Sequence, residues 1–408
     1  MTIDHETPLI LDATGADVQG EAARIRARGP VVAVVLPGAV TVWSVTDQAV
    51  LRGLMTDPRV SKDPNHWSAY RDGELPPDWV MVPWVAVRNM LNASGGDHRR
   101  LRRLVAPAFT DKRTRDMRPR IEAITVDLLD RLAETAPGDI ADLRAEFARP
   151  LPIRVITELM GVPAELGATL QVCADRTLDT TLGPEAAVTN FVQLNTALAE
   201  LIAYKRDHPG DDLTTVLIST SDEDGARLSE QELSDTLALI ITAGHETTTN
   251  LLDHAIHALL THPGQRADLD AGRITWSDVI EEALRHEPPI AHMPFRFAVA
   301  DIDLGDGVRI ARGEAFMASF AGANRDPQVY GDTADEFDAD RETKSHLAFG
   351  HGVHHCLGAP LARMEASVGL AALFERFPEM RLAAEPAALG HLPSVVMNGH
   401  RTLPVQLR

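Results

Sequence analysis

The sequence predicts a mainly α-helical protein with small β-sheets, organised as a single domain over residues 1–408. Apolar residues recur with helical periodicity along most of the chain, whereas strand-like alternation is short and rare. No Gly/Ser or Pro tract, fixed-period repeat or break in composition divides the 408 residues, and a hydrophobic content of 44% is sufficient for one large core.

The predicted elements follow in chain order. The apolar segment 31–43 is split by Pro37-Gly38 into two β-branched halves, which is typical of a hairpin. Helices are predicted over 120–135, 141–160, 188–205 and 278–286, and a short strand over 308–310.

The longest predicted helix covers residues 229–263. It begins with a capping box formed by Ser229 and Glu232 and ends at Pro263-Gly264. Its length is about 34 residues, or roughly 50 Å at the rise of an α-helix, so this helix must cross the whole domain.

The middle of this helix is rich in poor helix formers, namely Gly244 and the threonines at 247–249. Each costs about 0.5–1 kcal/mol relative to alanine. One explanation is that Gly244 allows close helix packing and the threonines bond back to carbonyls one turn earlier. The other is a widened turn with freed carbonyls, beside which Glu246 and Thr247 present a carboxylate and a hydroxyl to a pocket. A zinc-protease HExxH motif is excluded, because Thr249 stands where its second histidine is required.

The charge pattern limits the partners and the location of the protein. A net charge of -20 argues against nucleic acid as the main partner. Residues 99–120 nevertheless hold nine Lys or Arg against two Asp, which indicates either a solvated helix face or a docking patch for an acidic partner or an anionic cofactor. No apolar run reaches membrane-spanning length, and the acidic segment 1–12 lacks the features of a secretory signal, so we expect a cytoplasmic protein without a membrane partner.

The segment 346–363, HLAFGHGVHHCLGAPLAR, holds one of only two cysteines in the chain. A zinc site of His351, His354, His355 and Cys356 is one alternative, although adjacent residues seldom both reach one tetrahedral ion. A buried inert cysteine is another, but it explains neither the glycines nor Phe349. The spacing favours a thiolate presented from a tight loop before a helix that starts near Ala359, where backbone N–H groups can point at the sulfur.

Several segments together resemble the cytochrome P-450 family, the haem-thiolate monooxygenases, over nearly the whole chain. FGHGVHHCLGA (349–359) resembles the haem-binding loop, AGHET (243–247) the oxygen-activating motif of the long central helix, and EALR (282–285) the ExxR element. DHRRLRRLVAPAFT (97–110) resembles the helix that supports the haem propionates, and ANRDP (323–327) and FDADR (337–341) match the segments expected before the haem loop.

The resemblance implies a cytochrome P-450 fold whose long central helix crosses over the cofactor, haem b (iron protoporphyrin IX). It implies that Cys356 is the axial ligand of the haem iron and that the thiolate of Cys356 favours O–O cleavage. It also implies propionate partners and other cofactor contacts, namely His98, Arg102, Ala243, Arg296, Phe349, His354 and Gly358.

For catalysis the resemblance implies O2 as co-substrate and two electrons from a ferredoxin and ferredoxin reductase, supplied by NAD(P)H. Glu246 and Thr247 would relay protons, because an acid and an alcohol can do so without admitting bulk water. The basic residues Arg99, Arg100, Arg103, Lys112 and Arg113 would dock the acidic ferredoxin.

The ExxR pair separates what pattern predicts from what resemblance implies. On a helical wheel Glu282 and Arg285 lie opposite the apolar face, so the pattern alone predicts an exposed ion pair worth a few tenths of a kcal/mol. The resemblance implies instead that the pair is covered and joined by Arg341 in a structural network.

The expected substrate is a bulky, mostly hydrophobic, neutral molecule, steroid-like or macrolide/polyketide-like, with steroid hydroxylation as the first candidate. Two alternatives stay open: a haem-thiolate enzyme that uses peroxide directly, and a non-catalytic haem sensor. The predicted pocket walls are largely apolar and comprise Met81, Val82, Trp84, Val85, Leu239, Ile240, Ala243, Ile290, His292, Met293, Val396 and Met397.

Overall fold

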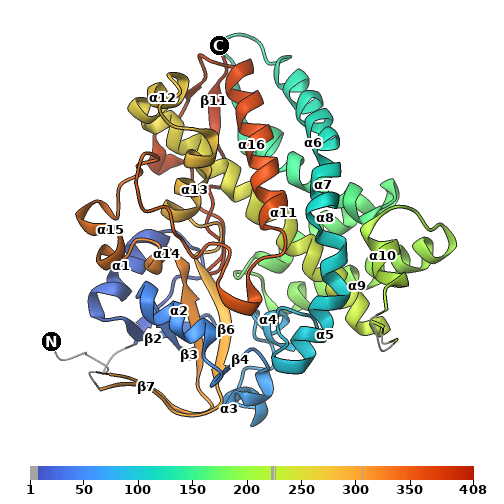
Figure 1. Ribbon diagram of the computed structural model, residues 1–408, viewed down its shortest axis with the longest axis vertical. Coiled ribbons are helices and arrows are strands. Elements are labelled where there is room, and N and C mark those ends of the chain that lie inside the picture. Colours follow the sequence, from blue (N-terminus) through green and yellow to red (C-terminus); the bar gives the residue numbers. More distant parts are fainter. Residues whose placement is uncertain (1–7, 222–224, 226, 306) are drawn as a thin grey trace.

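The computed structural model describes residues 8–221, 225, 227–305 and 307–408. Helices fill most of the molecule, and a sheet region lies at one end of it, which confirms the predicted class (Figure 1). The first seven residues, which begin the acidic segment 1–12, lie outside the described residues. None of the described helices combines the length and the apolar character that crossing a membrane requires.

The α-helices are α1 (Val18–Arg28), α2 (Gln48–Thr56), α3 (Ser68–Arg71), α4 (Pro83–Ala86), α5 (Gly95–Val105), α6 (Asp111–Leu132), α7 (Pro150–Met160), α8 (Ala164–Leu178), α9 (Pro184–Asp207), α10 (Leu213–Ser219), α11 (Glu230–Thr261), α12 (Pro263–Asp270), α13 (Trp276–His286), α14 (Phe320–Ala323), α15 (Pro327–Tyr330) and α16 (Ala359–Arg376). The strands are β1 (Leu9–Ile10), β2 (Val31–Leu36), β3 (Val40–Val45), β4 (Val60–Ser61), β5 (Ile140–Asp142), β6 (His292–Ala298), β7 (Ile302–Gly305), β8 (Val308–Ile310), β9 (Ala315–Ser319), β10 (Arg381–Leu382) and β11 (Pro404–Gln406).

The largest sheet has the strand order β1-β2-β3-β9-β6-β4. Its β2–β3 pair is the predicted hairpin, antiparallel and closed at Leu36 opposite Val40. Strands β6 and β9 were not predicted, because nearly all their residues are buried and they lack the alternation of a half-exposed strand. The short strand predicted at 308–310 is confirmed as β8.

Most predicted helices are confirmed with shifted ends. Segments 188–205 and 278–286 lie within α9 and α13, and segment 120–135 corresponds to the later part of α6. The helix predicted over 141–160 is wrong at its start. Ala141 and Asp142 lie in strand β5, a π-helix η3 (Arg144–Ala148) follows, and α7 begins only at Pro150.

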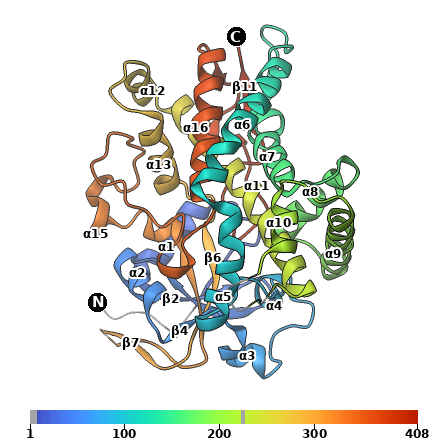
Figure 2. The ribbon, with the colours of Figure 1, turned by 45° about the vertical axis from the view of Figure 1, so that its right-hand side comes forward.

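Helix α11 is the predicted long helix and has 32 residues. The capping box of Ser229 and Glu232 is present at its start. The helix ends at Thr261, because Pro263 opens the separate helix α12 at a position where its missing N–H costs nothing. Figures 1 and 2 both show α11 passing through the centre of the helical part.

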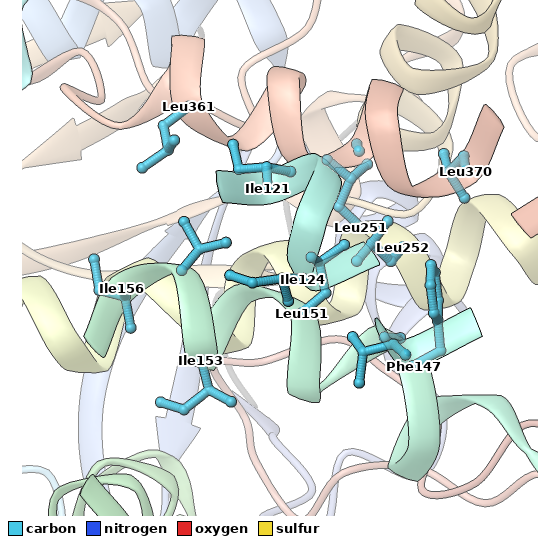
Figure 3. Packing of buried hydrophobic residues seen from close by; sticks show 14 of the residues in the cluster. Ile121, Ile124, Phe147, Leu151, Ile153, Ile156, Leu251, Leu252, Leu361 and Leu370 are labelled. Carbon is cyan, nitrogen blue, oxygen red and sulfur yellow. The ribbon is translucent and has the colours of Figure 1, made fainter. Parts of the chain in front are cut away.

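The main core holds α11 against its neighbours (Figure 3). Leu251 and Leu252 of α11 lie among side chains from α6, α7 and α16, including Ile124, Leu151 and Leu370. Burying side chains of this size contributes about 1.5–3 kcal/mol each. Because α16 starts three residues after Cys356, this packing also sets where the cysteine loop stands relative to α11.

Candidate functional site

Cys356 lies in a tight loop that directly precedes α16. Gly350 and Gly352 both have a φ of 72°, a left-handed conformation that favours glycine. The backbone N–H of Cys356 donates to the carbonyl of Phe349 over 2.9 Å and closes the loop. The predicted helix start at Ala359 is confirmed.

The Cys356 side chain is exposed, and it faces a cavity that the surrounding protein encloses. Burial raises the pKa of the Cys356 thiol, and hydrogen bonds from the backbone N–H groups of Gly358 and Ala359 oppose this effect. Coordination to a metal ion would lower the pKa of the thiol, because a thiol that binds a metal is deprotonated. The loop therefore presents one sulfur ligand whose charge is moderated by two N–H groups.

The zinc alternative has no support in the geometry. In the described residues, the groups of metal-ligating side chains that converge are Asp175 with His245 and Glu246, and Asp253 with His254 and His400. Neither group includes Cys356.

The cavity lies between α11 and the cysteine loop. Seven of the eight predicted cofactor contacts line it, and the eighth, His98, contacts one of them, His354, with ring centroids 4.1 Å apart. The seven are Arg102, Ala243, Arg296, Phe349, His354, Cys356 and Gly358.

Basic side chains gather on the wall of this cavity: Lys62, Arg102, Arg296 and His354. Burial lowers the pKa of Arg296 to about 10. Burial, together with the positive charge of neighbours such as Lys62, lowers the pKa of His354 to about 2. Burial and Arg296 hold the pKa of Lys62 well below its usual range. These basic side chains therefore lie close together without enough negative charge nearby to balance them.

These groups lack anionic partners in the described part of the chain. The ammonium of Lys62 donates to the carbonyl of Pro294 over 3.2 Å, while Nη1 of Arg296 and Nε2 of His98 are buried without a hydrogen bond. An uncompensated buried charge costs several kcal/mol. The two carboxylates of haem would offset this cost, so the residues present fit the haem that the resemblance implies.

Helix α11 stays regular where it borders the cavity, and the widened turn is not formed. The hydroxyl of Thr247 donates to the carbonyl of Ala243 over 2.7 Å. A Cβ at Gly244 would lie 2.9 Å from Cδ1 of Ile156 in α7. The first explanation from the sequence therefore holds: the glycine permits close packing, and the threonine bonds back to its own helix.

Glu246 and Thr247 face different cavities, which corrects the expectation that both open to one pocket. Successive helical residues diverge by about 100°, so only Thr247 shares the cavity of Cys356. The carboxylate of Glu246 accepts from Nη2 of Arg144 over 2.6 Å. Burial raises the pKa of Glu246, and the positive charge of Arg144 opposes the rise.

Glu246 lines a second cavity of about 330 Å³ between α11, η3 and the segment before β11. The exposed residue Arg401 and the half-buried Asp179 also line it, so it extends to the surface. Its other charged residues are Arg144, Arg149, Asp175 and Arg176.

The ExxR pair is fully buried, so the exposed ion pair predicted by pattern is wrong. The guanidinium of Arg285 binds the carboxylate of Glu282 over 2.7 and 2.8 Å. Nε of Arg341 lies 3.6 Å from the same carboxylate. The later segment 331–341 covers this face, as the resemblance implies, because Arg285 also binds the carbonyls of Ala334 and Glu336.

The predicted pocket walls divide into two groups. Leu239, Ile240, Ala243, Ile290 and Met293 line the cavity of Cys356. The remaining predicted wall residues do not line it. Met81 and Val85, before α5, are buried in the core beside the sheet, and Val82 and Trp84 pack against that core. Trp84 also lines a smaller cavity that shares Leu239. His292 and Val396 are buried, and Met397 is buried but lines the second cavity.

Sequence reasoning missed three residues of these sites. Lys62 follows strand β4, and only the tertiary structure brings it to Arg296. Arg144 lies in a segment whose pattern predicts an amphipathic helix, in which a single arginine is expected to face the solvent. Glu365, on α16, is a buried carboxyl on the wall of the Cys356 cavity, with Oε2 unpaired. A charged residue within a mostly apolar helical stretch was the available signal for Glu365.

Comparison with known proteins places these features in a family. The model of the cytochrome P-450 family matches residues 192–270 and 276–384. The chain is 46% identical over 402 residues to a 2-hydroxy-5-methyl-1-naphthoate 7-hydroxylase of Streptomyces carzinostaticus, with 98% of each protein covered. It is 39% identical over 408 residues to the cytochrome P-450 monooxygenase PikC of Streptomyces venezuelae, covering 98% of this chain and 95% of PikC.

Solved structures show the same similarity. CYP154A1 from Streptomyces coelicolor A3(2) superposes with a TM-score of 0.93 at 51% identity, covering 98% of this chain and 100% of that one. A testosterone-bound CYP154C4 from Streptomyces sp. ATCC 11861 superposes with a TM-score of 0.95 at 46% identity, covering 98% of both chains.

Proposed function

The chain belongs to the cytochrome P-450 family and is a haem-dependent monooxygenase, and we propose that it hydroxylates a bulky, mostly hydrophobic, neutral molecule, with a steroid as the first candidate. The cavity between Thr247 and Cys356 carries this proposal: aliphatic side chains such as Leu239 and Ile240 line it on the side of α11. The similar testosterone-bound structure supports a steroid, and a macrolide or polyketide-like scaffold is the alternative.

We assign Cys356 as the residue that would bind the haem iron. His98, Arg102, Arg296 and His354 would hold the propionates, and Lys62 would join them. When bound, haem supplies the activation of O2 for inserting one oxygen atom into a C–H bond. Phe349 and Gly358 would border the haem, and its propionates would supply the negative charge that the basic side chains lack.

The remaining chemistry of the chain is proton handling. The cavity of Cys356 is the proposed substrate cavity, and Thr247 places a hydroxyl on its wall. This hydroxyl is kept oriented because it donates to the carbonyl of Ala243. Glu246 takes protons from the second cavity, which extends to the surface. Transfer between them requires the Glu246 side chain to leave Arg144 or a bridging water. Separating the acid from the substrate cavity keeps bulk water away from the reaction.

We further propose that electrons come from a ferredoxin and ferredoxin reductase with NAD(P)H. Arg99, Arg103 and Lys112 are exposed on α5 and α6, which suits docking of an acidic protein. Arg100, Lys112 and Arg113 each pair with a carboxylate, but Arg100 and Arg113 are only partly exposed, so these two are weaker candidates for the docking surface.

The ligand assignment is tested by the carbon monoxide difference spectrum of the ferrous holoprotein. A strongly red-shifted carbonyl band indicates a thiolate ligand, and a Cys356→His variant should lose that band while it still binds haem. A wild-type band typical of histidine-ligated haem, in intact protein, would overturn the assignment of Cys356.

The substrate class is tested by titrating two probes while the ferric Soret band is followed. Testosterone represents a neutral steroid, and 2-hydroxy-5-methyl-1-naphthoate represents an aromatic acid. A low-spin to high-spin shift with testosterone at lower concentration supports the proposal. Tighter binding of the naphthoate would contradict the proposal of a neutral substrate. A buried carboxylate needs a cation, and the basic side chains of this cavity are already assigned to the haem propionates.

A further inference from the structure

Arg144 stands between two carboxylates of the same helix. Its Nη2 donates to Glu246 over 2.6 Å and to Asn250 over 2.9 Å, and its Nη1 donates to Asp253 over 3.2 Å. Glu246, Asn250 and Asp253 follow each other at helical spacing, so one face of α11 carries this network. The neighbouring face carries Thr247 and borders the substrate cavity.

The second carboxylate, Asp253, is itself shared. It is fully buried and accepts from the backbone N–H of His400 over 2.9 Å. Nδ1 of His400 lies 3.1 Å from the same carboxylate oxygen that Arg144 binds. Arg144 and His400 therefore compete for one carboxylate, and His400 is the member of this pair that changes its charge in the physiological pH range.

The charge balance follows from the state of His400. When His400 is protonated, two cations face two carboxylates, and Arg144 is free to hold Glu246 tightly. When His400 is neutral, Arg144 alone faces both Glu246 and Asp253, so its hold on Glu246 weakens. Low local dielectric in this buried network makes the difference larger than it would be in water.

On the basis of the proposed function, we propose that Asp253 and His400 are positioning residues for proton delivery. Through Arg144 they control whether the carboxylate of Glu246 stays bound to the arginine or turns toward the cavity that contains Thr247. Neither residue touches the substrate cavity, so neither is a catalytic residue.

Other charged and titratable groups surround His400 and enter any pH dependence. His254 and His257 of α11 place their rings 5.1 and 4.7 Å from that of His400, and His391 lies across the adjoining backbone bridge at 6.2 Å. Burial lowers the pKa of His257 to about 4, so it stays neutral while His400 titrates. Burial also acts on His400, but the hydrogen bond and charge of Asp253 raise its pKa above the ordinary value. Glu287 and Arg144 contribute opposite charges to His400.

The first experiment needs no substrate. Holoprotein with labelled histidine is titrated by NMR in the diamagnetic ferrous carbon monoxide form, and His400 is assigned from the signal that disappears in His400→Gln. In Glu246→Gln the pKa of His400 should fall, because Arg144 then turns fully to Asp253. By reciprocity, a group that controls Glu246 must respond to Glu246.

Asp175→Asn is the matched control, since Asp175 pairs with His245 and Arg149 but makes no contact with Arg144 in the described structure. Its effect on the pKa of His400 should be clearly smaller than that of Glu246→Gln. An unchanged pKa of His400 in Glu246→Gln, or an equal shift in both variants, would overturn the inference.

The second experiment measures proton delivery. With testosterone as probe and a surrogate ferredoxin system, the share of electrons recovered in product and the solvent isotope effect are recorded from about pH 6 to about pH 9, the range around histidine titration. In the wild type, the share of electrons recovered in product should change with pH as His400 titrates. This change should be absent from His400→Gln and retained in His391→Gln. Identical profiles for wild type and His400→Gln would overturn the inference. If testosterone is not converted, the substrate proposal fails and the NMR result alone decides this inference.

Discussion

Arg285 and Arg144 are both buried and both bind carboxylates, yet their surroundings differ. Arg285 is completely enclosed, and it binds Glu282 and the backbone carbonyls of Asn324, Ala334 and Glu336. Arg144 borders a cavity that extends to the surface, and its partners are side chains on one helix face. Backbone carbonyls cannot change charge, whereas carboxylates and a histidine can. The enclosed network thus suits a structural role, and the network beside the cavity suits adjustment of charge.

The largest effect should come from breaking the enclosed network. Arg285→Leu leaves Glu282 buried without its bidentate partner, with Arg341 only at 3.6 Å, which should lower the free energy of unfolding by about 3–5 kcal/mol. Such a loss is a large share of the stability of a typical domain, so little folded holoprotein should be recovered. Denaturant unfolding measures the loss. Arg118→Ala, which removes an exposed pair with Glu122, should change the stability by less than about 0.5 kcal/mol.

Glu246→Gln tests the network beside the cavity and should affect activity more than stability. The amide keeps the shape of the side chain but cannot carry a proton, so product formation should fall on the order of 100-fold. Haem content and the carbon monoxide spectrum should stay as in the wild type. Turnover within about twofold of wild type would show that Glu246 is not the acid of the relay.

Thr247→Ala sharpens the contrast between the two faces of α11. The hydroxyl bonds only to its own helix in the described structure, so its loss should cost little stability. Substrate binding should persist while electrons are diverted to hydrogen peroxide. The peroxide released per NAD(P)H consumed is the measurement, with Thr249→Ala, whose hydroxyl bonds to the carbonyl of His245, as the control in the same helix. An unchanged ratio of peroxide released to NAD(P)H consumed would show that Thr247 takes no part in the proton relay.

The smallest expected effect is on the pH dependence of stability. The pKa of His400 is raised by Asp253 in the folded protein, so the stabilisation is fully present below the unfolded pKa of about 6.5 and is lost as pH rises through the folded value. The difference in Tm between wild type and His400→Gln should therefore be larger near pH 6 than near pH 9, with a contribution of about 1 kcal/mol. A difference that grows with pH would contradict this sign.

Resemblance and pattern differed in how well they predicted the site. The residues of the cysteine loop, and Arg102, Arg296 and His354 of the basic wall, were identified from the resemblance, and most of them line one cavity. The apolar side chains predicted as pocket walls at Met81, Val82, Trp84 and Val85 could equally form a core, and Met81 and Val85 proved to be core. A buried side chain and a side chain that faces a substrate require the same apolar residue types, so composition does not separate them.

The sequence by itself determined the helical class, the hairpin, the long capped helix α11 and the helix that follows Cys356, because caps, turn residues and periodicity are local features. Only the tertiary structure decided that Glu246 turns to Arg144, that Lys62 joins the basic wall, and that Arg144 and His400 share Asp253. These contacts join residues more than 100 positions apart, and their energies depend on burial and on neighbouring charges. Neither quantity exists until the chain has folded.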